Sequence, residues 1–117
     1  MQSLFFRRAL ASLAIASGLV MAAMTAGAAA GAAAPATRTA TIEGTAFAPA
    51  DLTVTAGDVV VWVNKDPYPH TATSSAAGFD SSDIAPGKLW KYTAKTKGDF
   101  PYMCAIHPSM RGTLHVK

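Results

Sequence analysis

The chain has 117 residues, with ten Lys and Arg against seven Asp and Glu, a formal charge of +3 and a single cysteine. This length accommodates one domain, and a single cysteine excludes an intramolecular disulfide. Two of the ten basic residues, Arg7 and Arg8, lie in a segment that we expect to be removed, so residues 35–117 keep a net charge of only +1. That balance gives little support to nucleic-acid binding.

The first third of the chain has the pattern of a secretory signal peptide. A basic start containing Arg7 and Arg8 precedes an apolar, uncharged run over residues 9–23, and a tract rich in Ala and Gly follows. This order is typical of signal peptides with a small-residue cleavage site. We therefore predict a signal peptide over residues 1–34, cleaved between about 28 and 36, and one periplasmic domain over residues 35–117.

Two points about this segment stay open. The alternative to cleavage is a membrane anchor, which needs about 20 apolar residues, more than the run provides. The arginine pair matches a twin-arginine signal only in part, so the export route is either Sec or twin-arginine.

The rest of the chain is built from short segments in which apolar and polar residues alternate between turns. Alternation predicts half-buried strands, and the more continuous apolar run over residues 59–64 predicts a central one. The predicted strands are residues 38–43, 51–55, 59–64, 70–74, 88–95, 100–104 and 113–117. Pro101 indicates an edge or interrupted strand, because proline has no N–H to donate. With no helical periodicity after residue 36, we predict an all-β Greek-key sandwich of seven to eight strands.

Two expectations concern single positions of this sandwich. Phe47, in the loop over residues 44–50, is expected to cap the core. In the last strand, Leu114 and Val116 are expected to face inward and His115 to face solvent, because side chains alternate between the faces of a strand.

The only cysteine lies in a segment that holds three potential metal ligands. Cys104, His107 and Met110 follow one another at intervals of three residues, and Gly112 closes the segment. A second histidine, His70, follows a proline-containing loop elsewhere in the chain. One cysteine and two histidines in a trigonal plane, with a weak axial methionine, form the blue-copper arrangement. The four residues therefore predict one copper ion that cycles between Cu(I) and Cu(II).

Each of these residues has a simpler interpretation when it is taken alone. Cys104 would be a small buried hydrophobe, His107 a surface histidine and Met110 a core residue. For the set, one alternative is a structural zinc site, although zinc prefers four Cys and His ligands. Another is a Cys/His nucleophile, although so small a domain offers little substrate cleft and no natural orienting Asn or Asp. Their occurrence together on one loop bounded by Pro and Gly favours copper.

Two stretches of the sequence resemble the cupredoxins, the small blue copper proteins. The first comprises Phe47, Pro49, Leu52, Val54, Gly57, Asp58, Val60, Trp62, Asn64, Asp66, Pro69, His70 and Thr71. The second comprises Gly98, Asp99, Phe100, Tyr102, Cys104, His107, Met110 and Gly112. The short gap between His107 and Met110 is most similar to the amicyanin-like members of the plastocyanin/amicyanin group. Two positions depart from the family: Thr71 stands where Asn is frequent, and Ile106 where many members have proline.

The resemblance implies a cupredoxin-like fold with His70, Cys104 and His107 as equatorial copper ligands and Met110 as the axial one. It implies a periplasmic mobile electron carrier rather than an enzyme, with periplasmic copper delivery or sequestration as the alternative. We expect the backbone N–H of Thr71 to donate a hydrogen bond to the cysteine sulfur.

Expectations about partners follow from the same resemblance and from the residues around His107. Electrons are expected to pass through a small apolar patch formed by Tyr68, Pro69, Ile106 and Pro108. Expected partners are redox proteins such as a c-type cytochrome or a periplasmic dehydrogenase. The cleaved protein is expected to be a monomer without nucleic acid or membrane anchor.

Overall fold

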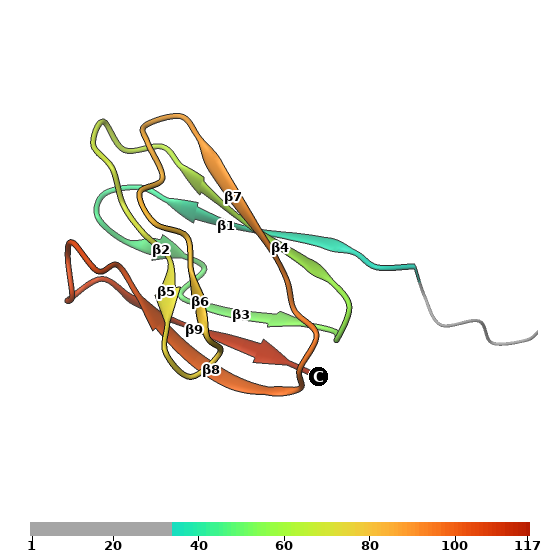
Figure 1. Cartoon of the computed structure of the whole chain (residues 1–117). Helices are drawn as coiled ribbons and strands as arrows, with labels where there is room; N and C mark the ends of the chain where they lie inside the picture. Colours follow the sequence, from blue (N-terminus) through green and yellow to red (C-terminus); the bar gives the residue numbers. More distant parts are fainter. Residues whose placement is uncertain (1–33) are drawn as a thin grey trace, which may run out of the picture. The chain divides into compact units, whose positions relative to one another are not determined.

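The computed structural model describes residues 34–117, which form the β-sheets drawn in Figure 1. The strands are β1 (Thr37–Ile42), β2 (Phe47–Ala48), β3 (Asp51–Val54), β4 (Val59–Asn64), β5 (Thr73–Ser74), β6 (Phe79–Asp80), β7 (Leu89–Thr93), β8 (Gly98–Met103) and β9 (Arg111–Val116). Residues 34–117 contain no helix, so the all-β prediction is confirmed. Within that range, accordingly, no helix has the length and apolarity to cross a membrane. The predicted signal peptide lies outside the described residues, apart from Ala34.

The strands are divided between two mixed sheets. One sheet has the order β2-β1-β4-β7 and the other the order β3-β9-β8-β5-β6. β1 pairs in parallel with β4, and β3 pairs in parallel with β9, whereas the other pairs are antiparallel. Because β3 leaves the sheet of β1 and β2 to pair with the last strand, the chain crosses between the layers of the sandwich more than once (Figure 1).

Trp62 on β4 is the centre of the core. Its side chain is fully buried, and its ring centroid lies 5.4 Å from those of Phe79 and Tyr102 and 5.6 Å from that of Trp90. Aromatic pairs at these separations add about 0.5–1.5 kcal/mol each beyond the area they bury. β4 lies between β1 and β7, as its apolar run predicted. The expected cap is also confirmed, since Phe47 is buried and packs edge-on against Tyr102 at 4.7 Å.

The expectation that Pro101 marks an edge or interrupted strand is only partly right. β8, which contains Pro101, has β9 on one side and β5 on the other. However, β5 is two residues long and pairs with β8 only through Thr73 and Met103. Pro101 therefore has no ladder partner in β5, and its carbonyl instead accepts a hydrogen bond of 2.7 Å from the hydroxyl of Ser74. Because β5 is too short to pair with Pro101, the missing N–H of this proline breaks no hydrogen bond between β5 and β8.

His115 is less exposed than the sequence predicted. Leu114 and Val116 face inward as expected, but the His115 side chain is only 31% exposed and lies between two carboxylates. Its Nδ1 is 2.6 Å from Oδ1 of Asp99 on β8, and its Nε2 is 3.4 Å from Oδ1 of Asp51 on β3. The hydrogen bond to Asp99 is the main reason why the pKa of His115 is raised, and the Asp51 carboxylate adds to it.

We expect this cluster to make the stability of the domain depend on pH. A raised pKa in the folded state means that the charged imidazole stabilises the fold fully below its unfolded pKa of about 6.5. This contribution is lost as the pH rises through the folded pKa. The measurement is the free energy of unfolding of the metal-free protein against pH, for the wild type and for His115→Gln. The difference between them should shrink as the pH rises, and a difference that grows would contradict the assignment.

Candidate metal centre

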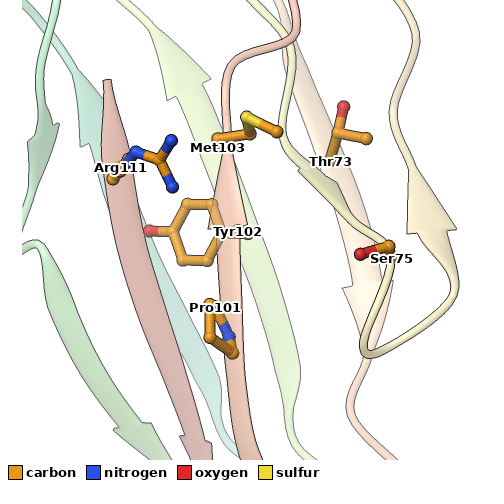
Figure 2. A pocket seen from close by; sticks show the side chains of 6 residues that line it. All are labelled: Thr73, Ser75, Pro101, Tyr102, Met103 and Arg111. Carbon is orange, nitrogen blue, oxygen red and sulfur yellow. The ribbon is translucent and has the colours of Figure 1, made fainter. Parts of the chain in front are cut away.

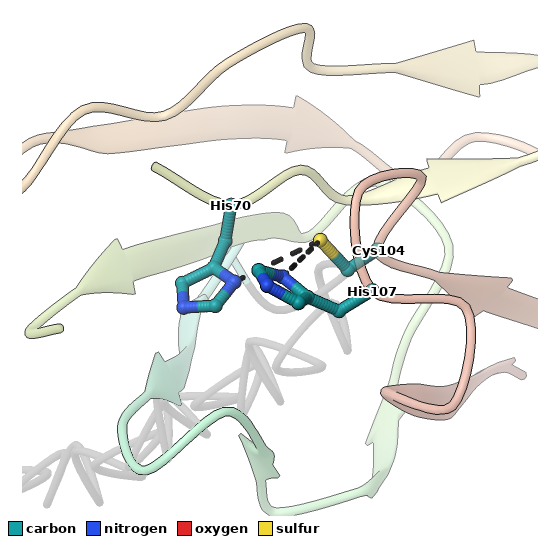
Figure 3. A group of neighbouring side chains, drawn as sticks. All are labelled: His70, Cys104 and His107. Carbon is teal, nitrogen blue, oxygen red and sulfur yellow. Dashed lines mark hydrogen bonds between the residues drawn. The ribbon is translucent and has the colours of Figure 1, made fainter. Parts of the chain in front are cut away.

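Three of the four predicted ligands converge at one end of the sandwich (Figure 3). The Sγ atom of Cys104 lies 3.7 Å from Nδ1 of His70 and 3.8 Å from Nδ1 of His107. One atom from each residue lies within 4.8 Å of the others, and His70 and Cys104 are fully buried. Residues 34 positions apart in the chain are thus brought together by the fold, in the way the cysteine-containing segment predicted.

His70 is held by the segment that joins β4 to β5. Its backbone forms an isolated bridge with Ile84, with N–H···O distances of 3.2 and 2.7 Å in the two directions. Asn64, fully buried at the end of β4, donates from its amide to the carbonyls of Tyr68 and Ile84 at 2.9 and 2.8 Å. A loop with two prolines needs such support, because proline removes backbone donors. Asn64 therefore fixes the position of the loop and, with it, the position of His70.

The carboxylate of Asp66 is the contact to His70 that sequence reasoning missed. Its Oδ2 lies 2.7 Å from Nε2 of His70, on the side of the ring away from Cys104. The N–H groups of Gly44 and Thr45 donate to the same carboxylate at 2.7 and 2.9 Å. The bond from Thr45 is the main cause of the lowered pKa of Asp66, and the Gly44 and His70 contacts add to it against the opposing effect of burial. An acidic residue four positions before the histidine was the available signal.

The segment from Cys104 to Met110 is closed by its own backbone. The N–H of Cys104 donates to the carbonyl of Met110 at 3.0 Å, and the N–H of Met110 donates to the carbonyl of His107 at 2.9 Å. The Met110 side chain is 3% exposed and belongs to the core cluster. The three predicted ligands of this loop therefore lie within one compact turn between β8 and β9.

Cys104 is poised to act as a thiolate. Burial raises the pKa of its thiol, but the N–H of Thr71 and contacts with the rings of His70 and His107 more than offset this, so the pKa falls to about 6. The Thr71 N–H donates to Sγ at 3.3 Å, which is the hydrogen bond expected from the sequence. A thiolate is the form of cysteine that binds metals. At neutral pH the site therefore offers a soft anionic ligand between two imidazoles.

The hydroxyl of Thr71 connects the His70 segment to the Cys104 loop. Its Oγ1 accepts a hydrogen bond of 2.8 Å from the N–H of Ala105 and lies 2.9 Å from the hydroxyl of Thr73. Thr71 thus contacts the sulfur of Cys104 through its backbone and the N–H of the next residue, Ala105, through its side chain. The shorter side chain at this position, where the family often has Asn, still reaches the loop.

The donor set fits copper. Nitrogen and sulfur atoms about 2.0–2.3 Å from one metal ion lie roughly 3.8 Å apart when arranged trigonally, which agrees with the separations around Cys104. Within residues 34–117, the group that holds Cys104 contains no fourth His, Cys or carboxylate, whereas structural zinc is usually bound by four such ligands. Two imidazoles and a thiolate with a nearby thioether match the type 1 copper set.

The structure has a surface pocket that does not include the predicted ligands. Figure 2 shows the lining side chains, which come from β8, β9, β5 and the turn after β5: Thr73, Ser75, Pro101, Tyr102, Met103 and Arg111. None of the four predicted ligands contributes to this lining. A nucleophilic mechanism at Cys104 would need a substrate space next to its sulfur, and this pocket does not supply one.

The four residues of the predicted electron-transfer patch are all exposed. Tyr68 is 44% exposed and Ile106 is 47% exposed, and both Pro69 and Pro108 are exposed as well. The Tyr68 ring lies 5.3 Å from that of His70 and 6.2 Å from that of His107. His107 itself is half-buried. Of the four patch residues, Tyr68 therefore lies near the rings of both His70 and His107.

Comparison with known proteins agrees with this geometry. A family model described as a cupredoxin-like domain matches residues 14–116. The chain is 30% identical to a plastocyanin of Scenedesmus fuscus over 84 residues, which cover 61% of this chain and 86% of that protein. It is also 30% identical to an amicyanin of Paracoccus versutus over 82 residues, which cover 65% of this chain and 61% of that protein.

Solved structures extend the comparison to the fold. A reduced amicyanin variant superposes with a TM-score of 0.63 at 26% identity, over 68% of this chain and 80% of that one. A copper-containing nitrite reductase of Thermus scotoductus has a TM-score of 0.64 at 26% identity, but only 22% of its chain is covered. With the family match over most of its length, the chain belongs to the cupredoxins, and copper is the cofactor that its donor set fits.

Proposed function

We propose that the protein is a periplasmic mobile electron carrier with a mononuclear type 1 copper centre. His70, Cys104 and His107 would hold the copper as the three strong ligands, and Met110 would be the weak fourth ligand. The observation that carries the proposal is the convergence of two imidazole Nδ1 atoms on one buried sulfur, at 3.7 and 3.8 Å. When bound, copper supplies a one-electron couple between Cu(I) and Cu(II).

The role of the protein in this proposal is to hold the ligands in one geometry for both oxidation states. The buried sulfur receives the N–H of Thr71, and the Thr71 hydroxyl receives the N–H of Ala105. On the other side of the site, the His70 segment is fixed by Asn64 and Ile84. Ligands that are held in place before transfer need little rearrangement when the electron arrives or leaves, which favours fast exchange.

His107 is the proposed point of electron entry and exit, because it is the half-buried ligand beside the patch of Tyr68, Pro69, Ile106 and Pro108. Redox encounters use small, weak interfaces, often below 1,200 Å² in total. A patch of four exposed side chains suits such a contact. The partners that we propose are a c-type cytochrome or a periplasmic dehydrogenase, and the carrier itself is not an enzyme. Export would follow from the predicted signal peptide over residues 1–34.

The alternative is copper delivery or sequestration, which uses the same ligands. It is favoured by the partial exposure of His107, through which copper could be exchanged. The hydrogen bonds that hold the ligand segments in place favour the carrier, because delivery benefits from open and exchangeable coordination.

The test is electrochemical. For the carrier we expect a reversible one-electron wave in voltammetry and self-exchange fast enough to broaden the nuclear magnetic resonance signals of His107 in partly oxidised samples. We also expect transfer of Cu(I) to a chelator to be much slower than electron exchange. Rapid transfer of Cu(I) with sluggish self-exchange would instead identify a delivery protein.

A further inference from the structure

We propose that Asp66 is a positioning residue for copper: its carboxylate holds the proton of His70 on Nε2, leaves Nδ1 free to bind the metal, and places a negative charge behind that ligand. The proposal rests on the proposed function, because it requires His70 to bind copper through Nδ1. Asp66, which does not bind the metal itself, would then help to set the redox potential of the copper.

The geometry around the imidazole supports this assignment. Oδ2 of Asp66 lies 2.7 Å from Nε2, while Nδ1 on the opposite side of the ring lies 3.7 Å from the sulfur of Cys104. A neutral imidazole has one N–H, and an ionised carboxylate only accepts hydrogen bonds. Nε2 must therefore donate to Asp66, and the lone pair is left on Nδ1, where it faces Cys104. A partner on the second ring nitrogen is the usual way in which proteins orient a metal-binding histidine.

The carboxylate is itself held in place. The N–H groups of Gly44 and Thr45 donate to it at 2.7 and 2.9 Å, and both residues have positive φ angles, of 62° and 56°. Such an angle is uncommon for threonine. The N–H of Asp66 donates in turn to Oδ1 of Asn64 at 2.9 Å. The side chain of Asp66 is only 6% exposed, so solvent does not compete for the bond to His70.

A fixed negative charge behind His70 has a predictable effect on the metal. It stabilises the more highly charged Cu(II) state over Cu(I), because the attraction to a cation grows with its charge and is weakly screened in a buried site. Removing the charge should therefore raise the redox potential. Loss of an outer partner commonly costs tenfold or more in metal affinity, and we expect that loss to fall mainly on Cu(II), whose higher charge interacts more strongly with the carboxylate. A tenfold change in the relative stability of the two states corresponds to about 59 mV for one electron.

Asp66→Asn removes the charge with little change of shape, and Asp58→Asn is its matched control. Asp58 is a second buried carboxylate, 5% exposed, that accepts backbone N–H groups from Ala36 and Thr55 at 2.9 Å each and has no contact with the site. Both variants lose a buried carboxylate that holds backbone donors, so both should lower stability. Only Asp66→Asn should raise the potential, by a shift equivalent to about tenfold, and Asp66→Glu should restore part of it.

The outcomes separate the two proposals. If the wild type is blue and reversible, and Asp66→Asn has the potential of the Asp58→Asn variant, Asp66 is only structural and this inference is wrong. If the wild type has no blue form, the proposed function fails instead. A second measurement needs no variant and covers the case in which Asp66→Asn does not fold. Nitrogen-15 spectra of the His70 ring, recorded on the metal-free wild type at pH 8, should place the proton on Nε2. A proton on Nδ1 would overturn the inference.

Discussion

Replacing Cys104 by Ser is expected to abolish the intense visible absorption of the oxidised, copper-loaded protein. The absorption of a type 1 site depends on the bond between Cu(II) and a thiolate. The Cys104 thiol has a pKa of about 6 in this environment, whereas a serine hydroxyl does not ionise near neutral pH. The expected result is a colourless protein with weakened copper binding, measured by visible absorption and electron paramagnetic resonance after addition of one equivalent of Cu(II).

Two controls separate this effect from misfolding. Serine has the same branching as cysteine, and its oxygen can accept the N–H of Thr71, so the metal-free Cys104→Ser protein should keep most of its unfolding midpoint in denaturant. Ser109→Ala alters an exposed residue of the same loop and should retain the full colour. A wild-type protein that is colourless and zinc-filled, and whose metal binding is the same after Cys104→Ser, would refute the copper site.

Gly112→Ala is expected to destabilise the domain by about 3 kcal/mol, at the upper end of the usual range for overpacking. A Cβ atom at this position would lie 2.5 Å from Cζ and the hydroxyl oxygen of Tyr102 and 2.7 Å from the carbonyl of Ala50. Tyr102 is the cross-strand partner of Gly112, and its ring is packed between Phe47 and Trp62. Neither the ring nor the backbone carbonyl can move away cheaply. The measurement is guanidinium unfolding of the metal-free protein.

Gly78→Ala is the comparison for this substitution. Gly78 has a φ of 71°, and a Cβ atom added there would meet no atom within 4 Å. Alanine at this position therefore costs only backbone strain of about 1–2 kcal/mol. Combining Gly112→Ala with Tyr102→Leu should recover part of the loss, which a double-mutant cycle would register as coupling between the two sites. A loss at Gly112 no larger than at Gly78, or additive behaviour with Tyr102→Leu, would show that the close approach is relieved elsewhere.

The sequence was sufficient to predict seven of the nine strands and the candidate ligands of the loop before β9, because both signals are local. Alternation over five or six residues predicted the strand of Val59–Asn64, and three potential ligands within seven residues marked the loop from Cys104 to Met110. His70 could be added because few histidines are present and one follows a proline loop. The two-residue strands β2 and β6 were missed, since so short a segment has no periodicity to detect.

The contacts that could not be predicted depend on which strands become neighbours. His115 lies between two carboxylates because β3 and β8 flank β9. The parallel neighbour β3 contributes Asp51, which is 64 residues before His115 in the chain. Asp66 reaches His70 only because the turn at Gly44 and Thr45 holds its carboxylate in place. Gly112 is closely packed only in the register that sets it opposite Tyr102. Composition and spacing contain no information about the contacts of His115 and Gly112, and for Asp66 they offer only its place four positions before His70.

The proximity of His70 and Cys104, 34 residues apart, links metal supply to the lifetime of the protein. A ligand that binds only the folded state raises its stability by an amount that grows with the logarithm of ligand concentration, about 4.1 kcal/mol at a thousandfold excess over Kd. For a domain with one cysteine and no possible disulfide, copper would be the cross-link between these distant segments. The metal-free form would then be the one that opens more often and is removed by proteases.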